Sequence, residues 1–384
     1  MKLTEKQKGD LIEFCRSLIR KKSPSGKEGK VAELIKKRME ELNYDDVWID
    51  DLGNVIGKTG GRGKTLVLEG HMDTVEAEEK NWEHDPFGGE VKDGKIYGRG
   101  ASDMKGALSA MVYGVGSTIG EKINGTIYVV GVVMEEIFEG VAFGEILDEI
   151  RADYVVLGES TELNINIGQR GRAEVVVRTK GKPTHSSNPQ FGVNAVYGMM
   201  ALGDEIRKLN LPEHEFLGNA IIELTDIISL PYPGASVVPY ECRATFDRRL
   251  ITGEDEEAVL KPIREIIGKL GIDAEAEIAF GESRTYTGMS LKSKKFFPAW
   301  LLDGEHELAK KSSNAVRAVG ISANFSKYSF CTDGSESAGA RGIPTIGFGP
   351  SKESLAHTRD EYVEINQLVK AAEGYATIAG SLLS

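Results

Sequence analysis

The chain has 384 residues, 40% of them hydrophobic and 28% charged, so it is long enough for two packed domains and has the composition of a globular enzyme. Its formal net charge is −12, and no run of lysine and arginine is interleaved with aromatic residues, which argues against nucleic acid or an anionic membrane surface as a partner. The longest apolar stretches have only the length of a strand, so we expect no membrane span.

Residues 1–22 have charges spaced through their apolar residues, which predicts an amphipathic helix rather than a secretory signal. The three cysteines are odd in number and form no CxxC motif, a pattern that fits a reducing compartment better than a disulfide framework. We therefore expect a cytoplasmic protein.

Strands and helices alternate in residues 26–159. Apolar residues at helical spacing predict a helix within 26–44, and Gly53 with Asn54 predicts the turn of a hairpin over 47–60. A strand, a second hairpin, a helix, a strand, a helix and a strand follow at residues 65–75, 88–100, 103–119, 126–135, 144–150 and 154–159. This order is typical of an α/β fold with a largely parallel sheet and helices on both faces.

From about Arg172 the order becomes strand, helix, strand, strand, helix, strand, at residues 173–181, 194–209, 220–229, 241–250, 254–270 and 274–280. This order predicts a self-contained α+β sandwich of the ferredoxin-like kind. Beyond it the chain returns to helix and strand and ends in a long helix. We therefore expect a catalytic α/β domain in residues 1–171 and 285–384, interrupted by an inserted lid domain in residues 172–284.

A histidine ends the first long apolar strand of the predicted sheet. Functional groups gather at the carboxyl ends of parallel strands, so His71 is a candidate metal ligand, although a histidine there can also be structural. Asp73 is close enough in sequence to accept a hydrogen bond from the imidazole nitrogen that faces away from the metal. Asp103 begins a helix, where aspartate is a common cap, but Gly98 and Gly100 before it favour a tight loop.

Acidic residues end two further strands. Glu135 and Glu136 follow an apolar strand directly, and their side chains should point to opposite sides, so that one can face a metal and the other a water. They could instead begin the next helix, at its favourable end. Glu159 follows another apolar strand with the same two alternatives, and a polar loop near the C-terminus carries His357.

These residues are more informative together than singly. Two histidines and several carboxylates form a borderline-hard ligand set that suits zinc, cobalt or manganese. A shared aspartate can hold two ions about 3.5 Å apart. The sequence therefore predicts a two-metal hydrolase.

Motifs along nearly the whole chain resemble, in family order, those of the M20 metallopeptidases, which include acetylornithine deacetylase, succinyl-diaminopimelate desuccinylase, aminoacylase and glutamate carboxypeptidase. They are SPSGKEG at 23–29, DLGNVIG at 51–57, GHMDTV at 70–75, the segment 82–106, MEE at 134–136, LGES at 157–160, GKPTHSSNPQFGVNA at 181–195, DRR at 247–249 and the segment 347–363. The resemblance implies one ligand set for each metal: His71, Asp103 and Glu159, and Asp103, Glu136 and His357. It implies that Glu135 is the general base and that Asp73 orients His71.

The resemblance also implies a function for the lid. His185 matches a histidine that, in the family's homodimers, reaches the active site of the opposite subunit and stabilises the oxyanion, so we expect a homodimer through the lid. Arg249 resembles an arginine that binds a substrate carboxylate, and we expect Arg170 to assist it, since a planar guanidinium suits this recognition. A surface salt bridge is the alternative for either arginine.

The expected reaction is hydrolysis of the amide bond of an N-acyl amino acid. The alternatives are a di- or exopeptidase on the same scaffold and, more distantly, a non-catalytic binding protein, although drift without catalysis should have damaged Glu135 or a ligand. Substrate-side positions depart from the family pattern at Ser236, at Gly334 with Ser335, and at Ser351. These departures leave the acyl group and the amino acid open.

Overall fold

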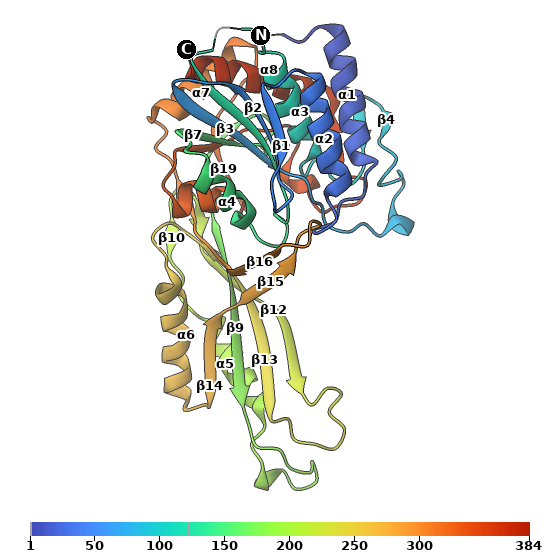
Figure 1. Cartoon of the computed structure of the whole chain (residues 1–384). Helices are drawn as coiled ribbons and strands as arrows, with labels where there is room; N and C mark the ends of the chain where they lie inside the picture. The colour runs from blue at the N-terminus through green and yellow to red at the C-terminus, as the bar shows by residue number, and fades with distance from the viewer. Residues whose placement is uncertain (1, 122) are drawn as a thin grey trace.

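The computed structural model describes residues 2–121 and 123–384, which form a large unit around one extended sheet and a narrower small unit that projects from it (Figure 1). Both chain ends lie in the large unit, at the end away from the small unit. Among the described residues, no helix is long and apolar enough to cross a membrane.

The large unit is organised by a nine-stranded mixed sheet. Its strands, in spatial order, are β1 (Asp46–Ile49), β2 (Val55–Gly60), β6 (Gly125–Val132), β3 (Lys64–His71), β7 (Tyr154–Leu157), β20 (Thr345–Gly347), β8 (Ile165–Gln169) and β18 (Trp300–Leu301), with β19 (Phe325–Tyr328) also paired to β8. The central strands β6, β3, β7 and β20 are parallel, while β1, β2 and β18 pair antiparallel at the two edges. The predicted parallel centre is therefore confirmed.

Helices cover both faces of this sheet. On one face lie α1 (Glu5–Ile19), α2 (Gly29–Glu41), α3 (Lys105–Gly116), α7 (Glu307–Ala318) and α8 (Ile365–Leu382), and on the other lies α4 (Val141–Glu149). Alternate residues of a strand point to opposite faces. In β3, Leu66 and Leu68 accordingly join the core under α3 and α8, whereas Val67 joins the core under α4.

The small unit is an antiparallel sheet with two helices packed on one face. Its elements are β9 (Gly171–Lys180), α5 (Ala195–Ile206), β12 (Ile221–Leu230), β13 (Glu241–Leu250), α6 (Glu256–Leu270), β14 (Ala274–Ile278) and β17 (Phe296–Phe297). The strand order β12-β13-β9-β14 leaves β12 at an edge. Its hydrophobic core is separate from those of the large unit and includes Val175, Met199 and Ile263. The elements follow one another in the order that the sequence predicts.

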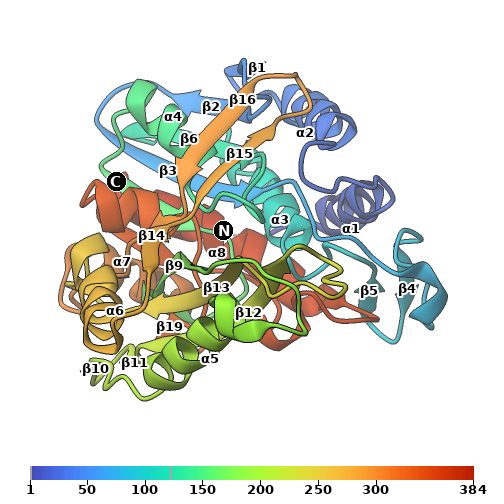
Figure 2. The same cartoon turned by 90° about the horizontal axis from the view of Figure 1, so that it is seen from below.

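The sequence did not indicate the hairpin of β15 (Phe280–Arg284) and β16 (Ser290–Lys294), which reaches from the small unit back to the large one beside β1 and α2 (Figure 2). At its tip, Tyr286 donates its hydroxyl to the carbonyl of Gly53 over 3.0 Å, and Thr287 donates to the carbonyl of Asp51 over 2.7 Å. The expected boundary after residue 284 falls in the turn of this hairpin. Its alternation is weak in the sequence because most of its residues are polar and partly exposed.

Shorter elements complete the chain. They are β4 (Glu90–Lys92), β5 (Lys95–Tyr97) and β21 (Tyr362–Glu364) in one small sheet, β10 (Glu213–His214) with β11 (Gly218–Asn219), 3₁₀ turns at Glu79–Asn81, Pro189–Phe191 and Glu353–Leu355, and a π-helical segment at Ser335–Ala340.

Candidate metal centre

Three neighbouring parallel strands deliver acidic and imidazole side chains to one edge of the large sheet. His71 is the last residue of β3, and its register partner Val132 is the last residue of β6, just before Glu135. Glu159 follows β7, which pairs with β3 on its other side. Because the carboxyl ends of parallel neighbours meet, residues far apart in the sequence lie together here.

His71 faces three carboxylates through a single nitrogen. Its Nε2 lies 2.9 Å from Asp103 Oδ1, 3.5 Å from Glu159 Oε1 and 3.9 Å from Glu135 Oε2. The ring is 1% exposed, so this arrangement is shielded from bulk water.

The second histidine faces Asp103 from the other side. His357 Nε2 lies 3.3 Å from Asp103 Oδ2 and 3.0 Å from Glu136 Oε2. Each oxygen of Asp103 therefore faces a different histidine. Glu135 and Glu136, although adjacent in sequence, point to the two different sides of this centre, as the alternation of the chain predicts.

These side chains fit divalent cations. Two overlapping groups, His71 with Asp103 and Glu136, and His71 with Glu135 and Glu159, each bring their ligand atoms within 4.8 Å of one another. The carboxylates of Asp103, Glu135, Glu136 and Glu159 have side-chain exposures of 13%, 8%, 8% and 6%. Across residues 2–121 and 123–384, none of them forms an ion pair with lysine or arginine. Buried carboxylates need compensating positive charge, which metal ions can supply.

The close packing of carboxylates and imidazoles shifts the pKa values of the metal-free centre. Burial would lower the pKa of His71, but its carboxylate partners, Asp103 first, raise it well above its ordinary value. Asp103 and Glu136 raise the pKa of His357 to about 10. Burial would raise the pKa of Asp103, yet hydrogen bonds from both histidines hold it well below its usual range. Burial, followed by the charge of Asp103, raises the pKa of Glu136 to about 7, and burial raises that of Glu135 as well.

Asp73 contacts His71 in a different way from the one expected. The Nδ1 of His71 is 2.9 Å from the backbone carbonyl of Asp73 and 3.6 Å from its carboxylate. The carboxylate instead accepts the backbone N–H groups of Glu135 and Glu136, over 3.1 and 3.2 Å, and the hydroxyl of Ser25 over 2.6 Å. Asp73 thus links the strand end that carries His71 to the turn that carries the two glutamates.

The loop that presents Asp103 is held by a residue whose role the sequence did not reveal. Glu361 accepts the backbone N–H groups of Ser102 and Asp103 over 2.7 and 3.0 Å, and it pairs with Arg99 over 2.6 Å. Asp103 does not cap α3, because the residue at the cap position is Met104 and no side chain bonds to that helix end. The capping alternative for Asp103 is therefore wrong.

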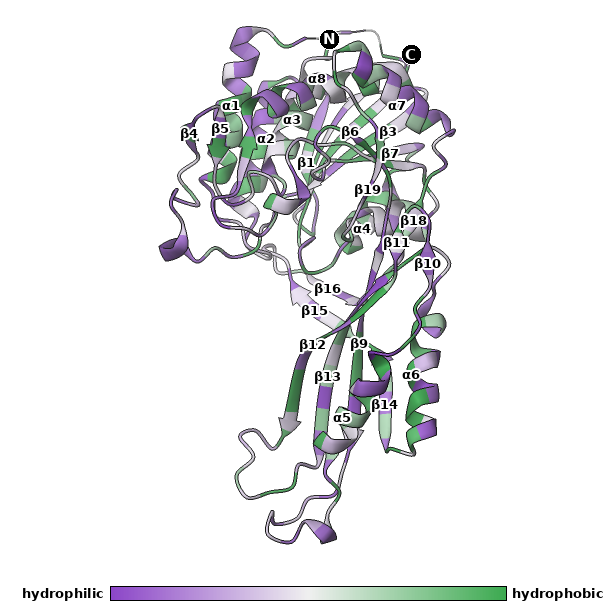
Figure 3. Cartoon of the chain, turned by 180° about the vertical axis from the view of Figure 1, so that it is seen from behind, coloured by the Kyte–Doolittle hydropathy of each residue, from purple (hydrophilic) through white to green (hydrophobic). Residues whose placement is uncertain are grey.

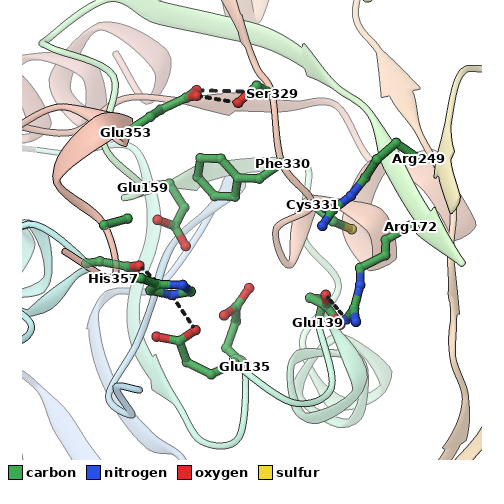
Figure 4. Close-up of a pocket in the computed structure, with 13 residues that line it drawn as sticks. Glu135, Glu139, Glu159, Arg172, Arg249, Ser329, Phe330, Cys331, Glu353 and His357 are labelled. Carbon is green, nitrogen blue, oxygen red and sulfur yellow. Dashed lines mark hydrogen bonds and ion pairs between the residues drawn. The ribbon is translucent and has the colours of Figure 1, made fainter. Parts of the chain in front are cut away.

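A cavity of about 480 Å³ opens onto this centre (Figure 4). His357 and the carboxylates occupy one side, and Arg172 and Arg249 face them across the cavity. Arg249 Nε donates to Asp247 over 2.6 Å, while Arg172 donates to Asp247 over 2.9 Å and to Glu139 over 2.8 Å. The remaining wall is formed by Glu139, Ser329, Phe330, Cys331, Glu353 and Ala356.

Neither Arg170 nor His185 lines this cavity. Arg170 donates to the backbone carbonyls of Ser329 and Asn219 and is not among the residues that line the cavity. His185 is exposed, bonds to Ser187 over 2.7 Å and bridges to Val237. The segment that follows β9 lies at the end of the small unit farthest from the large unit (Figure 1).

Arg172 and the other wall residues were missed because nothing local marks them. Glu28 lies in the SPSGKEG motif and Glu361 in the segment 347–363. A motif alone, however, does not say which distant backbone groups a carboxylate will contact. The short connection between β8 and β9 decides which of the neighbouring arginines enters the cavity.

The donor set beside an open cavity is that of a candidate metal-dependent enzyme, and the family match makes the chain a metallohydrolase that acts on amide or peptide bonds. A family model described as peptidase family M20/M25/M40 matches residues 67–381, and the chain belongs to this family. The expectation of an M20 hydrolase is thereby confirmed.

Similar proteins agree with this assignment. The chain is 33% identical over 383 residues to the uncharacterized protein YgeY of Escherichia coli (strain K12), covering 98% of this chain and 95% of that protein. It is 26% identical over 406 residues to the succinyl-diaminopimelate desuccinylase of Thioalkalivibrio sulfidiphilus (strain HL-EbGR7), covering 97% and 99%. The solved structure of the Bacillus subtilis YXEP protein, described as a dinuclear metal binding peptidase, shares the fold, with a TM-score of 0.73, 16% identity and 99% of each chain covered.

Proposed function

We propose that the protein hydrolyses the amide bond of an N-acyl amino acid and releases the free amino acid. The observation that carries the proposal is the cavity in which the carboxylate and histidine cluster faces Arg249. A guanidinium suits a carboxylate, and the cavity has the size that accommodates a small molecule. The desuccinylase among the similar proteins is named for a reaction of this class.

Two divalent ions are proposed as cofactors, with zinc first and cobalt or manganese as alternatives. His71, Asp103 and Glu159 would hold one ion, and Asp103, Glu136 and His357 the other. When bound, such ions polarise the carbonyl of the substrate and make water more acidic. The position of Asp103 between both histidines supports its role as the shared ligand.

Glu135 is the proposed general base. Its Oε2 lies 3.9 Å from His71 Nε2, beside the centre, and its side chain lines the cavity. There it can take the proton of the attacking water and return it to the leaving amine. Asp73 holds the backbone N–H of Glu135, which fixes the position of the carboxylate.

Arg249 is the proposed partner of the substrate carboxylate, and Arg170 assists it. Asp247 holds the Nε and one terminal nitrogen of Arg249, so the orientation of the guanidinium is fixed while its other terminal nitrogen is left to the substrate. Arg170 acts through the backbone, because it joins the 329 segment of the cavity wall to residue 219.

The small unit is proposed to act as a lid and to form a homodimer. Its edge strand β12 and helix α5 expose apolar side chains, among them Tyr197, Met200, Leu224 and Ile227, and much of β12 has the colour of hydrophobic residues in Figure 3. An exposed apolar edge strand favours pairing with another chain. In the dimer, His185 of one subunit would stabilise the oxyanion in the partner's site, a role that no contact within one chain provides.

The buried, unpaired state of Cys15, Cys242 and Cys331 supports the proposed cytoplasmic location.

The reaction is tested by assaying metal-stripped protein with N-acetyl and N-succinyl amino acids and with dipeptides, with and without zinc, cobalt or manganese. Metal-dependent release of free amine from the acyl amino acids is expected. Turnover of dipeptides alone would replace the deacylase with the exopeptidase alternative.

A further inference from the structure

The turn that carries Glu135 and Glu136 is held by side chains rather than by strand pairing. Strand β6 ends at Val132, so the next backbone N–H groups leave the sheet and need other acceptors. Residues 133–136 donate to Asn54, Glu28 and Asp73. The four hydrogen bonds run from Val133 N to Asn54 Oδ1 (2.9 Å), from Met134 N to Glu28 Oε1 (3.2 Å), from Glu135 N to Asp73 Oδ1 (3.1 Å) and from Glu136 N to Asp73 Oδ2 (3.2 Å).

The hydrogen bond to Glu28 is donated by Met134, whose backbone conformation is unfavourable. Met134 has φ of 64°, in the left-handed region that side chains other than glycine rarely adopt. Such a conformation is strained and persists only when its surroundings determine it. Met134 is fully buried, so its side chain belongs to the core while its N–H must reach an acceptor.

Besides Met134, the side chain of Glu28 holds the backbone of Gly26 in its own loop. Glu28 occupies the N-cap position of α2, yet its side chain makes no capping bond to that helix. One oxygen, Oε1, accepts both Met134 N and Gly26 N, over 3.2 and 2.9 Å, and the other has no partner within the described residues. Glu28 is fully buried, and Tyr286 of the β15–β16 hairpin lies close to the neighbouring Gly29.

We infer that Glu28 is a positioning residue that sets the place of Glu135 and Glu136 by accepting the N–H of Met134. The expected change in kcat rests on the proposed function. The expected change in zinc binding does not, because it depends only on how the turn presents Glu136 to a metal. Among the described residues, Glu28 makes no hydrogen bond or ion pair with a proposed metal ligand, so it acts on the centre through the turn.

The inference attributes the effect to one oxygen atom and not to the charge. Burial, followed by the charge of Asp73, raises the pKa of Glu28 to about 7, so a neutral side chain of the same shape is a close replacement. Glu28→Gln keeps the accepting oxygen and removes the charge. Glu28→Asp keeps the charge but withdraws the oxygen by one methylene. The two variants therefore have opposite expected outcomes.

The experiment compares these variants with the wild type and with Glu33→Ala, which changes an exposed residue on the same helix. Three quantities are measured: the melting temperature of metal-free protein, its rise on adding zinc, and kcat and KM. Glu28→Asp is expected to lose zinc affinity and kcat by about 10- to 100-fold, the usual cost of removing an outer-shell contact, with KM little changed. Glu28→Gln and Glu33→Ala should resemble the wild type.

The zinc-induced rise in melting temperature tests the inference even if the substrate proposal fails, because it needs no turnover. Wild-type zinc response and kcat in a folded Glu28→Asp would overturn the inference. Equal damage in Glu28→Gln would also overturn it, since the charge would then matter. If Glu28→Asp does not fold, Glu28→Met provides the acceptor-free side chain of similar size, judged by the same two outcomes.

Discussion

The carboxylate of Asp73 accepts the backbone N–H of Glu135 over 3.1 Å, and this bond joins the loop after β3 to the turn after β6. The same residue offers its backbone carbonyl to His71, 2.9 Å from Nδ1. A single residue thus orients the first histidine and positions the proposed base. Replacing Asp73 should therefore change metal binding as well as turnover.

Replacing Asp73 by alanine keeps the backbone carbonyl that contacts His71 but removes the carboxylate that holds the backbone N–H groups of Glu135 and Glu136. It should weaken metal binding by about 10- to 100-fold, because residues that orient metal ligands typically contribute this much. Calorimetric titration of the metal-stripped variant with zinc measures the change. Glu76→Ala removes an exposed acid from the same loop and serves as the control. Unchanged zinc affinity in Asp73→Ala would show that the turn presents Glu136 to the metal without the carboxylate of Asp73.

Replacing Glu135 by glutamine should leave the metal content unchanged and reduce kcat by roughly 10²- to 10⁴-fold, the usual contribution of a general base. The amide keeps the size of the side chain but cannot take a proton at neutral pH. Metal analysis and steady-state rates are measured on the same preparation, with Glu145→Gln on the surface of α4 as the control. Substantial activity in Glu135→Gln would remove it as the base.

The sequence could predict that the candidate ligands lie together, because most of them stand at or just after the ends of strands with clear apolar patterns. His71, Glu135 and Glu159 each come directly after such a strand, and parallel neighbours bring strand ends together. For Asp103 the glycines before α3 favoured a tight loop. Only the structure excluded the alternative that Asp103 caps the helix.

The supporting contacts could not be predicted in the same way. The bond from Met134 to Glu28 joins residues 106 positions apart, and no local pattern specifies such a pair. The β15–β16 hairpin was missed because its strands are half exposed and polar. Arg172 was missed because only the geometry between β8 and β9 distinguishes it from Arg170.

Metal binding near pH 7.5 should release protons. In the metal-free protein the pKa of His357 is raised to about 10, chiefly by Asp103, and that of His71 is raised as well, so both rings are protonated at this pH. A ligating imidazole must be neutral, so each ring loses its proton on binding, and affinity should increase as the pH rises from 6 to 8.

Zinc titrations in buffers with different ionisation enthalpies measure this release, since the observed heat then depends on the buffer. His84→Gln, which changes a histidine of the small β4–β5 sheet region, should release as many protons as the wild type. Heats that are the same in every buffer would contradict the protonated state of the metal-free centre.

Replacing Arg249 by leucine should raise KM for N-acyl amino acids by about 10- to 100-fold, since a hydrogen bond to a charged group contributes about 1.5–3 kcal/mol. Arg170→Leu should have a smaller effect, because its guanidinium donates to the carbonyls of Ser329 and Asn219. A substrate amidated at its carboxylate provides the control, since it should not distinguish Arg249→Leu from the wild type. An unchanged KM for the acid substrate would exclude Arg249 as its partner.

The proposed exchange of His185 between subunits predicts complementation. Within one chain His185 is exposed, its ring bonds to Ser187 and its backbone bridges to Val237, so the proposed catalytic role needs a second subunit. His185→Ala and Glu135→Gln should each be nearly inactive as homodimers. When the two are unfolded together and refolded, each heterodimer contains one site with an intact Glu135 and with His185 of the partner subunit.

The mixed preparation should therefore regain activity, whereas mixing the two homodimers without unfolding should not, provided that subunits exchange slowly. Refolding each variant alone controls for gain of activity by the procedure itself. Complete inactivity of the refolded mixture, with dimers present by sedimentation, would mean that His185 does not serve the opposite site. Full activity of the His185→Ala homodimer would lead to the same conclusion, because no oxyanion contact would then depend on the imidazole.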